Sequence, residues 1–145
     1  MWIHKFQQQT DLDPAELWQI LANIAGWADI DENIETISID GIPMKGSKFL
    51  LKPKGGPLLT FNIGDFDPPV AYSDVCQMPF ATMTTTHRLF AGDVTTIDIQ
   101  ITIEGFLSPL WGFLVGQKHA NGLPAQTTRF IAAARELKVA KIHGA

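Results

Sequence analysis

The sequence predicts an α+β fold in which a seven-stranded antiparallel sheet wraps around one long C-terminal helix. A helix-start signal lies close to the N-terminus, and the middle of the chain alternates apolar and polar residues between turn residues. A long segment with helical spacing closes the chain. The predicted order is one strand, two short helices, six strands and one long helix, in a single domain over residues 1–145.

The N-terminal elements follow from local signals. Trp2–Gln9 alternates loosely and predicts the first strand. Asp13 is suited to cap a helix whose first residue is Pro14, and Gly26 is suited to end it. A second short helical turn is expected around Trp27–Ile30.

The next six segments have a period of two and predict strands separated by tight turns. They lie around Ile37–Ile39, Phe49–Leu51, Leu59–Ile63, Val70–Gln77, Ala81–Phe90 and Val94–Glu104. The last shows the clearest alternation, with isoleucine at 97, 99, 101 and 103 and polar residues, among them Asp98 and Gln100, between them. One face of the sheet should therefore be covered and the other largely exposed to water.

The C-terminal helix is expected from about Ser108 to about Lys138. Its first half, "GFLSPLWGFLVG", is strongly apolar, and it is the only element long enough to cover the sheet. Gly122 and Pro124 predict a bend near Asn121–Pro124, because proline removes a hydrogen bond of the helix. The space between sheet and helix need not be filled by side chains.

Composition excludes several classes of function. The chain has 145 residues, a net charge of −4 and scattered basic residues, so we expect no nucleic-acid partner. The single cysteine, Cys76, and the lack of a signal peptide predict a cytoplasmic protein. No apolar run is long enough for membrane insertion, and we expect a monomer or homodimer.

The order of elements and the DPAELW segment that opens the first helix resemble the SRPBCC superfamily, the START/Bet v 1-like helix-grip fold. Trp27, Gly41 and Gly46 fall where that family often has these residue types, and residues 73–136 resemble its polyketide cyclase/dehydrase-like branch. The resemblance implies that the first strand pairs with the last, and that a cavity between sheet and helix binds an apolar small molecule. It implies no cofactor and no single reaction.

The predicted ligand-binding residues are the inward-facing side chains of the strands and of the early helix. They are Phe49, Leu51, Phe61, Met83, Thr85, His87, Ile97, Ile99, Ile101, Trp111, Leu114 and Val115.

His87 is the candidate catalytic residue, and the hairpin after Phe90 decides where it points. A three-residue loop, Ala91–Asp93, places His87 opposite Ile97 on the inner face and Arg88 outside. A two-residue loop places His87 opposite Asp98 and buries Arg88, which is costly, so we favour the first.

Other motifs are explained by structure alone. Gly41–Lys48 is one residue out of register for a phosphate loop and is followed by a strand. No histidine pair has metal-ligand spacing, so no metal is expected, and a small buried side chain explains Cys76. The acidic residues at 29, 31, 32 and 35 are expected in a solvated loop, without paired carboxylates at a site.

Three functions follow as hypotheses. The first is binding of a hydrophobic small molecule such as a lipid, polyketide or aromatic metabolite. The second is a cyclase or dehydratase that acts on such a ligand, with His87 as acid or base and Thr85 as its polar partner. The third is a protein-interaction module in which the cavity has collapsed.

Overall fold

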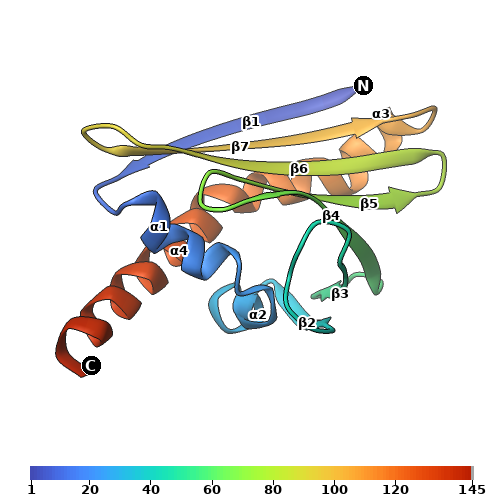
Figure 1. Ribbon diagram of the computed structural model, residues 1–145. Coiled ribbons are helices and arrows are strands. Elements are labelled where there is room, and N and C mark those ends of the chain that lie inside the picture. Colours follow the sequence, from blue (N-terminus) through green and yellow to red (C-terminus); the bar gives the residue numbers. More distant parts are fainter. Residues whose placement is uncertain (145) are drawn as a thin grey trace.

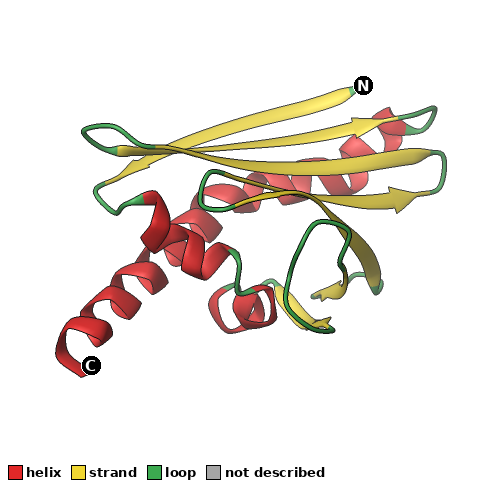
Figure 2. Cartoon of the chain, in the orientation of Figure 1, coloured by secondary structure: helices red, strands yellow, loops and turns green. Residues whose placement is uncertain are grey.

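A computed structural model describes residues 1–144 and shows the predicted architecture (Figure 2). The sheet strands are β1 (Trp2–Thr10), β2 (Ile34–Ile39), β3 (Lys48–Pro53), β4 (Leu59–Asp67), β5 (Ala71–Met78), β6 (Ala81–Phe90) and β7 (Thr95–Glu104). The helical elements are α1 (Pro14–Leu21), a 3₁₀ turn η1 (Ile24–Gly26), α2 (Trp27–Ile30), α3 (Ser108–Trp111), a π-helical turn η2 (Gly112–Gly116) and α4 (Gln117–Gly144).

The seven strands form one antiparallel sheet in the order β1-β7-β6-β5-β4-β3-β2. The first strand pairs with the last, as the family resemblance implied. Figure 1 shows the sheet curving over α4, with α1 and α2 packed beside that helix. The predicted α+β helix-grip fold is therefore confirmed.

The hairpin between β6 and β7 differs from the prediction in its register. Phe90 lies opposite Thr96, and His87 lies opposite Ile99 rather than Ile97, so the predicted three-residue loop is wrong. The shift is two residues, and because side chains alternate with a period of two, each residue keeps its face. Arg88 lies opposite Asp98 on the outer face, and the inner-face position of His87 is correct.

The burial of the side chains on β7 agrees with the prediction on the inner face but not fully on the outer face. The isoleucines at 97, 99, 101 and 103 are buried. Asp98 and Gln100 are half-buried rather than largely exposed. They lie on an interior strand, between Gln7 and Lys5 of β1 and Arg88 and Thr86 of β6, and these long neighbours cover them.

A β-bulge in β4 bends the sheet around the helix. The register between β4 and β5 shifts between Ile63 and Phe66. Gly64 lies at this point, where an added Cβ would be 2.7 Å from the Ser73 hydroxyl oxygen. That hydroxyl accepts a hydrogen bond from the Asp65 amide at 2.7 Å, which satisfies a donor freed by the bulge.

The C-terminal helical run is continuous from Ser108 to Gly144 and departs from α geometry at η2. Here the indole of Trp2 packs against Gly112 and Gly116, where added Cβ atoms would lie 2.5 and 2.7 Å from its ring. Pro124 lies inside α4 with helical residues on both sides. The proline therefore does not divide the helix in two, and the bend at Asn121–Pro124 stays a prediction.

Candidate functional site

A cavity of about 790 Å³ lies between the inner face of the sheet and α4. Eleven of the twelve predicted ligand-binding residues line it, from Phe49 on β3 to Val115 on η2. The exception is Ile101, which has no exposed surface and is packed in the core away from the cavity. Sequence alternation identified the inner face correctly, but it could not show which part of that face the helix covers.

Most of the exposed residues that line the cavity lie in three segments, which we call the mouth. These are the loop after β3, around Lys54–Pro57, the turn after β5, around Pro79, and the helical residues Trp111–Lys118. The Trp111 Nε1–H donates a hydrogen bond to the Pro79 carbonyl oxygen at 2.8 Å, which ties two sides of this mouth together. Large apolar side chains are exposed on the adjoining segments: Phe80, Phe106, Leu110, Phe113 and Leu114.

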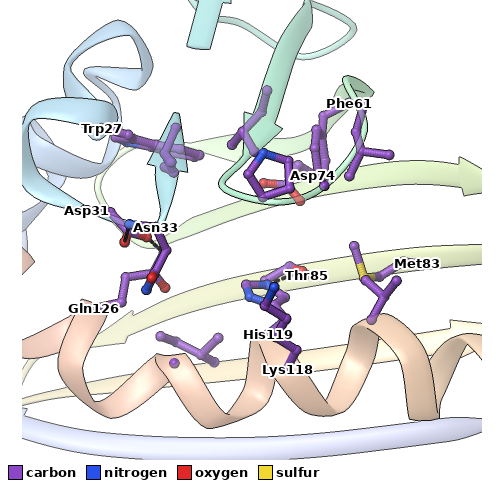
Figure 3. Close-up of a pocket in the computed structure, with 18 of the residues that line it drawn as sticks. Trp27, Asp31, Asn33, Phe61, Asp74, Met83, Thr85, Lys118, His119 and Gln126 are labelled. Atoms are coloured by element: carbon purple, nitrogen blue, oxygen red, sulfur yellow. Dashed lines mark hydrogen bonds between the residues drawn. The ribbon is translucent and has the colours of Figure 1, made fainter. Parts of the chain in front are cut away.

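Four polar residues of the lining lie close together: Asp74, Thr85, His87 and His119. Tyr72 is fully buried beside Asp74 and His87 and does not line the cavity itself, and we call these five residues the polar cluster. Strand pairing places Tyr72 opposite His87, and Asp74 opposite Thr85. The Tyr72 hydroxyl donates a hydrogen bond to Asp74 Oδ2 at 3.0 Å. The fifth member, His119, reaches across from α4, and its Nε2 lies 3.4 Å from Thr85 Oγ1 (Figure 3).

Burial controls the charges of this cluster. It raises the pKa of Asp74 to about 7, although the hydrogen bond from Tyr72 acts in the opposite direction. Burial lowers the pKa of His87 to about 4, with a further contribution from nearby His119, and it also lowers the pKa of His119. Both imidazoles are therefore neutral at pH 7, while the Asp74 carboxyl exchanges its proton near that pH.

His87 lies where its predicted role requires, but with different neighbours. Its ring is tilted against Tyr72, with 5.8 Å between the ring centroids. Its Nδ1 is buried without a hydrogen-bond partner in the part of the chain that the structure describes. The Thr85 hydroxyl, expected to be the partner of His87, lies near His119 instead.

The expectation that Asp31 lies in a solvated loop is wrong. Asp31 is 4% exposed and lines the cavity at the end near α2. It accepts hydrogen bonds from the Asn33 amide and the Gln126 side chain, both at 2.9 Å (Figure 3). It follows α2 directly and turns under α4, whereas its acidic neighbours at 29, 32 and 35 are exposed. Two buried carboxyl groups therefore line the cavity, Asp31 after α2 and Asp74 on β5.

Sequence reasoning also missed Asp74 and His119 as site residues, although each carried a signal. Asp74 alternates with Tyr72 and Cys76, which are both buried on the inner face of β5. His119 follows Trp111 and Val115 at intervals of four residues, which is the spacing of one helix face.

Within residues 1–144, no group of three or more metal-ligating side chains is close enough to hold a metal ion. No helix in the same range is long and apolar enough to cross a membrane.

The fold recurs in solved structures of low sequence identity. Ara h 8.0201 shares 14% identity, with a TM-score of 0.73 over 93% of this chain and 99% of that one. A point mutant of norcoclaurine synthase from Thalictrum flavum, solved with a transition-state analogue, shares 11% identity, with a TM-score of 0.74 over 94% and 96%. The di-domain aromatase/cyclase BexL of the BE-7585A biosynthetic pathway shares 12% identity, with a TM-score of 0.67 over 93% of this chain and 49% of that one.

No protein-family model matches the sequence, and no curated protein matches it significantly. The structural similarities define the fold class: the chain has the helix-grip fold that these three solved structures share. They confirm the resemblance at the level of the fold.

Proposed function

We propose that the protein binds a hydrophobic small molecule in the cavity between the sheet and α4. The observation that carries this proposal is the cavity itself, because about 790 Å³ of space lined mainly by apolar side chains is far more than packing defects leave. Its volume falls in the range of roughly 300–1,000 Å³ that is usual for small-molecule sites. The same volume argues against an interaction module with a collapsed cavity.

The lining favours a ligand with an aromatic or extended apolar body. Phe49 and Phe61 stack with their centroids 5.1 Å apart, and Trp27 meets Phe49 edge-on at 5.7 Å. These rings form a rigid apolar wall at the end of the cavity built by β3 and β4. Aliphatic side chains from β7, among them Ile97 and Ile99, continue the wall.

A first experiment is native mass spectrometry of freshly purified protein, which should show a bound small molecule. A second measures binding of a naphthalene-sulfonate dye to two variants of the same helical run. Val115→Trp fills the cavity and should weaken dye binding about tenfold, while Val139→Trp, at an exposed position outside the cavity, should leave it unchanged. The proposal fails if the protein binds no apolar molecule, or if both variants bind the dye as the wild type does.

A second candidate function is a cyclase or dehydratase reaction on the bound molecule, with His87 as acid or base. The polar cluster favours it, because acid–base chemistry needs titratable groups that converge on a sheltered ligand. A molecule extracted from the protein should then be converted when it is incubated with fresh protein, with loss of the mass of water for a dehydratase and with a change of chromatographic retention at constant mass for a simple cyclisation. His87→Phe should slow that change by a factor of roughly 10²–10⁴.

A further inference from the structure

The ionisable groups of the cavity are distributed unequally. Its two buried charged residues, Asp31 and Asp74, are both acids. The two lysines that line it, Lys54 and Lys118, are exposed, so their ammonium groups can remain hydrated. Among the described residues, no salt bridge joins a lysine or arginine to either buried acid.

The two acids also differ in how far the protein satisfies them. Asp31 receives one hydrogen bond on each carboxyl oxygen, from Asn33 and Gln126. Asp74 receives one side-chain hydrogen bond, from Tyr72 to Oδ2, and it lines the cavity. A buried carboxyl group is costly to keep without a cation or a full set of donors, so Asp74 has unused capacity for a ligand.

We propose that the ligand is an apolar molecule that carries a protonated amine, and that Asp74 binds this amine. The inference rests on the proposed ligand-binding function and names the polar end of the ligand. An ammonium group has three N–H donors, and the wall around Asp74 offers acceptors for them. One N–H pairs with the carboxylate, and the Thr85 hydroxyl oxygen and a neutral imidazole nitrogen of His119 lie on the adjoining wall.

The same arrangement disfavours an anionic ligand such as a fatty acid. A carboxylate placed at the polar cluster would face Asp74 in a medium of low dielectric, where like charges repel strongly. The exposed lysines at the mouth lie outside the polar cluster.

The groups around Asp74 stay neutral at pH 7 and above, so the ionisation of Asp74 can be studied by itself. On β5 itself, Tyr72 and Cys76 both have raised pKa values, so both stay neutral up to pH 8. His87 on β6 and His119 on α4 have lowered pKa values, so both imidazoles are uncharged at pH 7 and above. Asp74, with a pKa of about 7, is therefore the member of the polar cluster that still changes charge above pH 7.

The test uses three naphthalene probes that differ in their polar group: 2-naphthylmethylamine, 2-naphthalenemethanol and 2-naphthoate. Calorimetric titration at several pH values gives the affinity of each. The amine stays protonated through pH 8, so its affinity should rise roughly 30-fold between pH 5.5 and 8 as Asp74 ionises. The alcohol should change less than threefold, and the naphthoate should bind weakest at pH 8.

Variants assign the effect to Asp74. Asp74→Asn should remove the preference for the amine and its pH dependence, while Asp98→Asn, on the outer face, should keep both. Should Asp74→Asn not fold, Tyr72→Phe provides the same test. Without the tyrosine hydrogen bond the Asp74 pKa rises, so the gain in amine affinity should move to higher pH.

The outcomes separate the two proposals. If none of the three probes binds, the proposed ligand-binding function fails. If the alcohol binds and the amine binds no better at pH 8, the inference about the amine is overturned. It is also overturned if the preference survives in Asp74→Asn and disappears in Asp31→Asn.

Discussion

Replacing Asp74 by asparagine should change how the stability of the protein depends on pH. The side chain is 6% exposed, and its one side-chain hydrogen-bond partner among residues 1–144 is the Tyr72 hydroxyl. Asparagine has nearly the same shape, can accept the same hydrogen bond through its amide oxygen, and carries no charge. The substitution therefore isolates the cost of ionising a buried carboxyl group.

The magnitude follows from the shift in pKa. The Asp74 pKa rises from 3.8 to about 7 on folding, so the ionised form costs about 4 kcal/mol more in the folded state than in the unfolded state. Because the folded-state pKa is raised, the folded protein binds the proton more tightly. Stability is therefore lost as the pH rises from about 4 towards 7, and it levels off above that.

The assay is urea denaturation, followed by tryptophan fluorescence, of the wild type and Asp74→Asn at pH 5 and pH 8. The variant should gain about 2.5 kcal/mol in free energy of unfolding relative to the wild type over this range. His87 and His119, whose pKa values are lowered by folding, destabilise both proteins as the pH falls below about 6.5, so their contribution largely cancels in the difference. Parallel pH profiles for the two proteins would refute the reasoning.

Four other substitutions test the helix and the cavity. Trp111→Ala removes a half-buried indole and its hydrogen bond to Pro79. We expect altered binding of the naphthalene-sulfonate dye and a loss of about 1–2 kcal/mol in the free energy of unfolding, measured by urea denaturation. A loss of about 3–5 kcal/mol with unchanged dye binding would identify Trp111 as a core residue instead. Gly116→Ala should lower the melting temperature because its methyl group meets Trp2, whereas Gly122→Ala, with open space around it, should raise the free energy of unfolding by about 0.5–1 kcal/mol. His87→Phe should keep the fold and shift ligand preference towards less polar molecules in competition titrations; a preference that stays the same would show that the imidazole does not contact the ligand.

The fold was predictable because its elements carry strong local signals. Ile97, Ile99 and Ile101 mark a strand with one buried face, and Asp13 with Pro14 marks the start of a helix. For the hairpin between β6 and β7, the sequence predicted which face of the sheet each residue occupies, but not which residues pair. Local preferences favour a short loop, but pairing along the whole length of β7 sets the register, and these longer-range contacts cannot be read from the turn residues.

The site was predictable where it depends on alternation and not where it depends on tertiary contacts. Met83, Thr85 and His87 follow from the inner face of β6. Asp31 lies in an acidic segment that is typical of a solvated loop, and only the approach of Gln126 from α4 explains its burial. Asp74 follows the alternation of β5, but a general expectation that aspartate is exposed works against it.

The π-helical turn η2 keeps one face of the C-terminal helical run turned towards the sheet. Ser108, Gly112, Gly116 and Ala120 are all buried, at intervals of four residues. In a regular α-helix each such interval overshoots a full turn by about 40°, so three of them would rotate the stripe about 120° away from the sheet. A turn closed by i→i+5 hydrogen bonds contains about one residue more than an α-helical turn. This extra residue returns the buried stripe to the side that faces the sheet.

This turn also lies between the mouth of the cavity and its polar cluster. Adding or removing one residue in Gly112–Gly116 would rotate Trp111 by about 100° relative to α4. The phase of His119 and of the rest of α4 would not change. A change of one residue in chain length could therefore reshape the entrance of the cavity while its chemical groups stay in place.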